Sequence, residues 1–163
     1  MISYRKMTQE EFSEYRKYSN SFRGKELSEA QQVSVSEGIR LANDELDECL
    51  PSGLETAGNY LMCVEVEIDQ QSHVVGYLWY GYGSGDNSAY IYDFQIFSNY
   101  RSQHYGSRVF NLLEQTLKSD GIDQIELLVA YDNERAFKLY KELGFKATGI
   151  NMVKKTVNEY SAY

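Results

Sequence analysis

The chain has 163 residues, of which 42% are hydrophobic and 25% charged, and its formal net charge is −8. This length is sufficient for one domain whose core needs neither disulfides nor a structural metal. The acidic balance argues against nucleic-acid binding, which requires a basic face to displace counterions from phosphates. It would also steer a cationic ligand toward the protein.

The N-terminus and the cysteines predict a cytoplasmic protein. Residues 1–11 are polar and charged, unlike a signal peptide, and no apolar run approaches the roughly 18 residues that a membrane span requires. Cys49 and Cys63 are the only cysteines, and their spacing is typical of neither a metal site nor a redox motif. We therefore expect two reduced thiols, no metal and no membrane partner.

The first third of the chain reads as one strand and two helices. Residues 2–7 predict a short strand, and 8–11 have the spacing of a capping box that opens a helix. A second capping box at 28–31 predicts a longer helix toward Leu50, which 51–53 (Pro-Ser-Gly) would end. One face of the first helix carries Phe12, Tyr15, Ser19 and Phe22.

The middle of the chain reads as strands. Apolar and acidic residues alternate over 64–68, a polar turn follows at 69–73, and 74–80 is apolar again, which predicts an antiparallel hairpin. The glycine-rich segment 81–88 joins two strands rather than a strand and a helix, so it is not expected to bind a dinucleotide. Residues 89–97 predict the next strand.

The remainder alternates helices and strands. Apolar residues recur at helical spacing over 105–117, and Gly121 is expected to close that helix. The apolar run at 125–129 predicts a central strand covered on both faces. A helix over 134–143 and a last strand over 146–156 complete a mixed α/β sheet in one domain.

Two segments have the composition of a functional site. The loop 99–107 lies between a strand and an amphipathic helix, and the unpaired N–H groups of a helix N-terminus can hold a phosphate. Arg101 and Arg108 add cations nearby. In the second segment, 133–145, Tyr140 shares the sheet-directed face of a helix. It is either a core aromatic residue or a proton donor, since a phenol pKa of about 10 keeps it protonated at neutral pH.

The chain resembles the GNAT superfamily of N-acetyltransferases over roughly residues 89–156. The family's final motif, Asn-x-x-Ala-x-x-Leu-Tyr-x-x-x-Gly-Phe, is matched at every fixed position by Asn133, Ala136, Leu139, Tyr140, Gly144 and Phe145. The pyrophosphate loop of the family is matched by Arg101 and Gly106, but His104 stands where its first glycine is expected. Residues 1–60 agree with the family only in their pattern of elements.

The resemblance implies a single-domain GNAT (acyl-CoA N-acyltransferase) fold, α/β in class, with a mixed, mostly antiparallel sheet flanked by helices. The whole chain, 1–163, would be one domain, with 1–60 on the acceptor side and an acetyl-CoA-binding core at 61–156. The implied activity is transfer of the acetyl group of acetyl-CoA to a primary amine, by direct attack in a ternary complex. Fold does not select among small-molecule and peptide amines, so the acceptor stays unidentified.

Carried over by position, the family's site includes backbone and side-chain contacts to the cofactor. Phe94, Gln95 and Ile96 would run alongside the pantetheine arm, and Tyr140 would protonate the leaving sulfur. The pyrophosphate would be held by residues of one loop: Arg101, Ser102, Gln103, His104, Tyr105, Gly106 and Ser107. Asn133, Ala136 and Phe137 would also contact the cofactor. A Cβ at His104 is expected to shift this loop or weaken binding, because glycine adopts positive φ more readily.

The general base is not set by the family, so two carboxylates are considered. Asp93 comes first because it lies among apolar residues in the strand that should border the site, where a charge needs a partner or a cleft. Glu55, in the loop after the second helix, comes second. The alternatives are an aspartate satisfied by neighbouring backbone and a solvated loop glutamate. The acidic run 44–48 would attract a basic acceptor or simply form a solvated helix face.

Two other functions remain open at this stage. One is a non-catalytic protein that kept the GNAT fold and binds or senses acyl-CoA, which His104 favours and an intact Tyr140 and Asn133 oppose. The other is a structural role without coenzyme, for which the sequence offers no positive sign. A homodimer across the last strand or the hairpin edge is also an expectation, since an unpaired strand edge invites pairing.

Overall fold

The computed structural model describes residues 1–83, 87–154 and 156. The chain forms two compact units, residues 1–128 and 129–163. None of the helices in the described ranges combines the length and the apolar composition that a membrane crossing requires.

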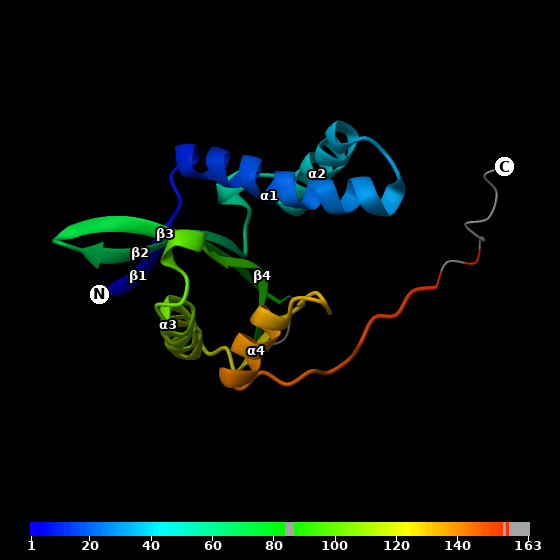
Figure 1. Ribbon diagram of the computed structural model, residues 1–163. Helices are drawn as coiled ribbons and strands as arrows, with labels where there is room; N and C mark the ends of the chain where they lie inside the picture. Colours follow the sequence, from blue (N-terminus) through cyan, green and yellow to red (C-terminus); the bar gives the residue numbers. More distant parts are fainter. Residues whose placement is uncertain (84–86, 155, 157–163) are drawn as a thin grey trace. The chain divides into compact units, whose positions relative to one another are not determined.

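The first unit is a five-stranded sheet with helices on both faces. Its strands are β1 (Ile2–Lys6), β2 (Asn59–Ile68), β3 (Gln71–Tyr82), β4 (Ser88–Ile96) and β5 (Gln124–Leu127), adjacent in that order. The pairs from β1 to β4 are antiparallel, and β4 and β5 are parallel. The helices α1 (Gln9–Gln31) and α2 (Val35–Cys49) lie on one face and α3 (Tyr105–Ser119) on the other (Figure 1). The predicted mixed, mostly antiparallel α/β sheet is confirmed.

The predicted hairpin is confirmed with a tighter turn than expected. The strands pair up to Ile68 and Gln71, so the turn consists of Asp69 and Gln70 rather than residues 69–73. Both residues have positive φ, 51° and 63°, as in the type I′ turns whose twist matches that of the flanking strands.

The first capping box is also confirmed. The Thr8 hydroxyl accepts from the backbone N–H of Glu11, and the Glu11 carboxylate accepts from the N–H of Thr8. Arg5 donates two further hydrogen bonds to Glu11 and one to Glu65 of β2. These bonds lower the pKa of Glu11 to about 2. One carboxylate therefore connects the start of α1 to β1, and through Arg5 to β2.

The second predicted capping box is wrong, because α1 continues through it. Ser28 lies inside the last turns of α1, and its hydroxyl donates to the carbonyl of Val33 (2.7 Å) instead of capping a new helix. The helix ends at Gln32, which is left-handed with φ 55°. α2 begins after Ser34, whose side chain accepts from the N–H of Glu37.

The core on the α1–α2 side contains a cluster of buried residues from both helices and the sheet. Its centre is Tyr15, which is fully buried. The short 3₁₀ helix η1 (Gly53–Glu55) contributes one leucine. The buried members of the cluster are Met7, Phe12, Tyr15, Leu46, Leu50, Leu54, Leu61, Cys63 and Trp79.

Two strand predictions near the end of the chain are wrong. β5 is the last strand in the order of the sheet, and exposed positions alternate with partly buried ones along it, so it is not a central strand covered on both faces. Residues 146–154 and 156 form no strand, and 155 lies outside the described residues. Ile150, Met152 and Val153 are exposed (71%, 91% and 96%), because no described strand pairs with this segment and covers it.

The strand order also revises the edges expected for a dimer. The β2–β3 hairpin is not an edge, since β1 pairs with β2 and β4 pairs with β3. The other expected edge, a last strand over 146–156, does not form among the described residues of that range. A homodimer stays a prediction without either of these edges. The glycine-rich segment 81–88 begins in β3 and ends in β4, and 84–86 lie outside the described residues.

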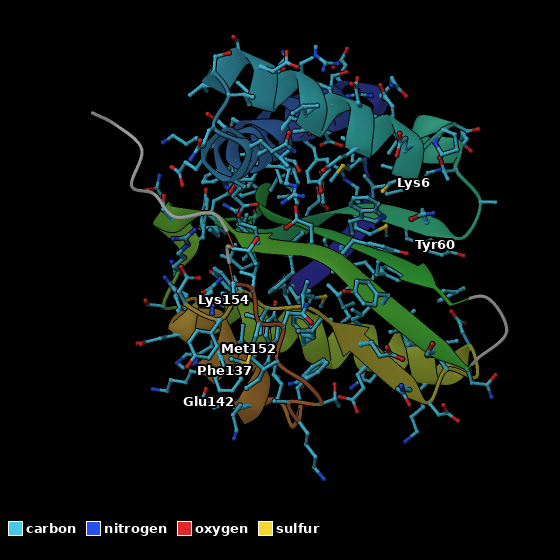
Figure 2. The ribbon with its side chains drawn as sticks, turned by 90° about the vertical axis from the view of Figure 1, so that its right-hand side faces the viewer. Lys6, Tyr60, Phe137, Glu142, Met152 and Lys154 are labelled. Carbon is cyan, nitrogen blue, oxygen red and sulfur yellow. The ribbon has the colours of Figure 1, made fainter. Side chains whose placement is uncertain are left out.

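The second unit contains the predicted amphipathic helix. α4 (Glu134–Glu142) follows Asn133, and Gly144 ends it with a φ of 93°. Phe137 and Glu142 both belong to this helix (Figure 2).

Candidate functional site

The central feature of the first unit is the point where β4 and β5 part. Their ladder ends at the pair Ile91–Leu127, whereas β4 continues to Ile96 along β3. Within the described residues, positions 92–96 of β4 therefore have a strand neighbour on one side only. This open backbone edge is suited to an extended ligand that pairs with a strand. The predicted cofactor contacts Phe94, Gln95 and Ile96 all lie on it.

A β-bulge lies at the beginning of this open segment. Asp93 pairs with Trp79 and Ile91 with Tyr80, so Tyr92 is the extra residue of β4. Bulges re-aim the side chains that follow them and are frequent beside active sites. After the bulge, Phe94 faces α3, where its ring meets that of Phe110 edge-on (centroids 4.8 Å apart). Asp93 faces α1.

Asp93 is held by a tyrosine of α1. The Tyr15 hydroxyl donates to the Asp93 carboxylate (2.9 Å) across the interface between helix and sheet. Burial raises the pKa of Asp93, and the hydrogen bond from Tyr15 offsets this only in part. A carboxylate in this setting binds a proton more readily than an exposed aspartate does, which is the property that a general base requires.

Further tyrosines surround this pair. Tyr18 donates to the side chain of Gln95, and the ring of Tyr77 packs edge-on against Tyr15 (5.3 Å) and Phe97 (5.0 Å). Burial raises the pKa of Tyr18 and of Tyr77, so both stay protonated at neutral pH. Sequence reasoning missed the tyrosines around Asp93. The only available signal was the placement of Tyr15 on the apolar face of its helix.

The other base candidate lies in a different environment. Glu55 ends η1, its side chain is 78% exposed, and its carboxylate pairs with Lys6 at 2.7 Å (Lys6 is labelled in Figure 2). The Glu55 carboxylate thus pairs with an exposed ammonium group and not with the tyrosines around Asp93.

The acidic run 44–48 takes part in ion pairs along α1 and α2. Its members Asp44, Glu45 and Asp47 contact one arginine each, and these arginines are Arg40, Arg23 and Arg16. Two of these three ion pairs join one helix to the other. The arrangement supports the solvated helix face among the two interpretations of the run.

The loop before α3 has the backbone of an anion site. His104 is the N-cap residue of α3 and is left-handed (φ 59°), and Ser102 is also left-handed (φ 61°). The N–H groups of Tyr105, Gly106 and Ser107 follow in the first turn of the helix, where backbone donors and the helix dipole favour an anion. Arg101 donates from Nε to the carbonyl of Ile96 (2.9 Å), which ties this loop to the end of β4.

In the second unit, the family motif has a local structural role. Asn133 Oδ1 accepts from the N–H of Ala136 (3.1 Å) and so caps α4. Phe137 is 42% exposed. The ring of the half-buried Tyr140 meets that of Phe145 (centroids 5.6 Å apart), and the N–H of Phe145 donates to the Tyr140 carbonyl. The helix cap and the turn after the helix explain Asn133, Gly144 and Phe145 without any contact to a cofactor.

Both cysteines are free, with Cys49 exposed and Cys63 buried. Burial raises the pKa of Cys63 to about 12. That thiol is therefore protonated at neutral pH and unsuited to nucleophilic attack.

Comparison with known proteins places this arrangement in a family. Residues 21–145 match the acetyltransferase (GNAT) family. The chain is 30% identical over 151 residues to the uncharacterized N-acetyltransferase YycN of Bacillus subtilis (strain 168), a match that covers 91% of this chain and 95% of YycN. It is 24% identical over 152 residues to YdgE of the same organism, described in the same words, with 91% of this chain and 94% of YdgE covered.

Solved structures agree with this assignment. A crystal structure of YycN from Bacillus subtilis is similar over 97% of this chain and 100% of that chain, with a TM-score of 0.84 at 29% identity. The PaiA N-acetyltransferase from Thermoplasma acidophilum, solved in complex with coenzyme A, shares the fold with a TM-score of 0.64 at 19% identity, over 93% of each chain. The family match covers more than half of the chain, and YycN is similar over nearly all of it, so this chain belongs to the GNAT family of acetyltransferases.

Proposed function

We propose that this protein transfers the acetyl group of acetyl-CoA to a primary amine, by direct attack of the amine in a ternary complex. The observation that carries the proposal is the parting of β4 from β5 beside the half-buried carboxylate of Asp93. It provides an open strand edge at 92–96 and a proton acceptor, Asp93, on the neighbouring α1 face.

The residues present fit the cofactor. The backbone of Phe94, Gln95 and Ile96 would pair with the amides of the pantetheine arm, and the N–H groups at 105–107 would hold the pyrophosphate. Local donors are necessary because the net charge of −8 repels a polyphosphate at long range. When bound, acetyl-CoA supplies an activated acetyl thioester.

Asp93 would act as the general base of the reaction. An amine of high pKa arrives protonated and must lose a proton before it can attack a thioester, and a raised carboxyl pKa suits that transfer. Tyr15 would orient the carboxylate through its hydrogen bond. Tyr140 would donate its phenolic proton to the departing thiolate, as its place in the family motif implies.

A second function is favoured by one observation. His104 holds a left-handed conformation with a Cβ where the family's motif has glycine, which costs free energy and narrows the approach of a phosphate. A protein that binds acyl-CoA weakly and does not turn it over would tolerate this change. Acetyl transfer is preferred because Tyr140 matches the family motif and Asp93 offers a candidate base beside the open strand edge.

Calorimetric titration of acetyl-CoA into the wild type and His104→Gly tests the cofactor. We expect micromolar binding by the wild type and equal or tighter binding by the variant, because glycine removes the Cβ and the strain. Weak binding by the wild type that the variant tightens, without turnover of acetyl-CoA, would favour the second function. An absence of binding by the wild type would overturn the proposal.

Release of free thiol in the presence of an amine panel then tests the reaction. Tyr140→Phe should lower kcat by about 10²- to 10⁴-fold with little change in acetyl-CoA affinity, because it removes only a proton donor. Unchanged turnover by this variant would remove Tyr140 from the mechanism.

A further inference from the structure

A groove of about 630 Å³ lies between the beginning of α1 and the sheet. It is separate from the open edge of β4. The helix contributes one wall, and β2, β3 and the residue after β4 contribute the floor. The residues that line it are Glu10, Glu11, Ser13, Glu14, Cys63, Val74, Tyr77 and Phe97.

The floor of the groove is apolar. Val74, Tyr77 and Phe97 are half-buried, and each leaves part of its apolar surface open to the groove. The Cys63 thiol beneath them is protonated. A hydrocarbon chain placed here would be removed from water at about 25 cal/mol per Å² of buried apolar surface.

The rim of the groove is acidic. Glu10 is exposed, and its carboxylate makes no ion pair or hydrogen bond with the part of the chain that the structure describes. Among the described residues, Glu14 forms an ion pair with Lys17 alone (2.7 Å, both side chains mostly exposed). Glu11 is held by Arg5 and Thr8. Two carboxylates above an apolar floor are thus available to a cation.

The groove shares one residue, Tyr77, with the group of tyrosines around Asp93. Tyr77 lines the groove, and its ring also packs edge-on against Tyr15, which donates to Asp93. A ligand that extends from the carboxylate past Tyr77 would therefore enter the groove. Because the rim of the groove is acidic, the far end of such a ligand should carry a positive charge.

We propose that this groove binds the distal end of an aliphatic diamine acceptor, a proposal that rests on the acetyl transfer proposed above. The hydrocarbon chain would lie on Val74, Tyr77 and Phe97, and the second ammonium group would meet Glu10 and Glu14. A wholly apolar ligand would leave the rim carboxylates without a cation, and a small amine would leave the floor uncovered.

The test compares α,ω-diaminoalkanes with 1-aminoalkanes of the same chain length, in a thiol-release assay with acetyl-CoA. At low ionic strength we expect kcat/KM to favour the diamine by roughly five- to tenfold, as two exposed ion pairs of modest strength would produce. The double variant Glu10→Gln and Glu14→Gln should abolish this preference by raising KM for the diamine, while kcat for the monoamine stays unchanged. Glu29→Gln removes a charge from the same helix outside the groove and should preserve it.

A binding measurement separates this proposal from the proposed function. Equilibrium dialysis of a diaminoalkane in the presence of coenzyme A should show weaker binding to the double variant than to the wild type or Glu29→Gln. Equal binding and equal kcat/KM in all three proteins would overturn the proposed role of the groove in diamine binding and leave the proposed acetyl transfer intact. Groove-dependent binding without thiol release from any amine would overturn acetyl transfer instead.

Discussion

At the scale of single residues, the most informative contact is the hydrogen bond from Tyr15 to Asp93. It joins a helix near the N-terminus to a strand 78 residues later and holds a carboxylate in a largely apolar place. Burial raises the pKa of that carboxylate, which favours its role as a base. The same burial penalises the charged form of Asp93 in the folded protein.

Asp93→Asn tests that penalty. A carboxyl group whose pKa is raised on folding carries no charge penalty at low pH, where it is protonated in both the folded and the unfolded state. The free energy of unfolding then falls as pH rises from the usual aspartate pKa of about 3.9 through the raised pKa of the folded protein. Asn keeps an oxygen for the Tyr15 hydroxyl and carries no charge. The stability of Asp93→Asn relative to wild type should therefore increase between pH 4 and pH 8, measured by urea unfolding, although its acetyl transfer is lost.

The matched control is Asp123→Asn, which removes the charge of an exposed aspartate in the same unit. Its stability difference from wild type should stay flat over the same pH range. A similarly flat difference for Asp93→Asn would show that the Asp93 carboxyl group carries no folding penalty.

At the scale of elements, α1 and α2 approach at backbone distance. A Cβ on Gly38 would lie 2.1 Å from the carbonyl oxygen of Gly24, and a Cβ on Gly24 would lie 2.6–2.8 Å from atoms of Ile39. The crossing therefore depends on glycine in both helices, although glycine is a poor helix former. The interhelical ion pairs of Arg16 and Arg23 lie along the same two helices.

Gly38→Ala should consequently destabilise the protein, although alanine favours the helix by about 1 kcal/mol. The methyl group must push the helices apart, and we expect a net loss of about 1–3 kcal/mol, measured by urea unfolding. Glu48→Ala, at an exposed position of α2, should change stability by less than about 0.5 kcal/mol. An increase in stability for Gly38→Ala would show that the helices do not cross this closely.

At the scale of the whole molecule, the charge is acidic while the expected cofactor is an anion. In the proposed mode of binding, backbone N–H groups at the start of α3 and the open edge of β4 would supply the attraction, so binding would be local and selective for the folded state. A ligand that binds only the folded state stabilises it by mass action.

Acetyl-CoA at about 100 times its dissociation constant should stabilise the fold by about 2.7 kcal/mol. For a chain of this size, that corresponds to a rise in Tm of roughly 5–11 °C. Thermal unfolding over a series of acetyl-CoA concentrations measures it, with inorganic pyrophosphate as the control ligand. A Tm that does not rise with acetyl-CoA would contradict the proposed binding surface.

Much of the local structure follows from the sequence, because its causes lie within a few residues. The capping box of Thr8 and Glu11, the alternation along β2 and the cap at Asn133 each act over one turn or one strand. The order of the motifs also identified the family. The same local reasoning was wrong at Ser28, because a serine within a continuing helix has the same spacing to its neighbours as one that caps a new helix.

What only the tertiary structure decided depends on contacts between distant segments. The pairing of Tyr15 with Asp93, the parting of β4 and β5 after Ile91, and the edge position of β5 arise when helices and strands pack together. Hydrophobic periodicity indicates which face of an element is apolar, but it does not indicate which other segment of the chain covers that face. The sequence therefore determined most of the elements and the motifs, and long-range packing decided which residues surround the Asp93 carboxylate and line the groove.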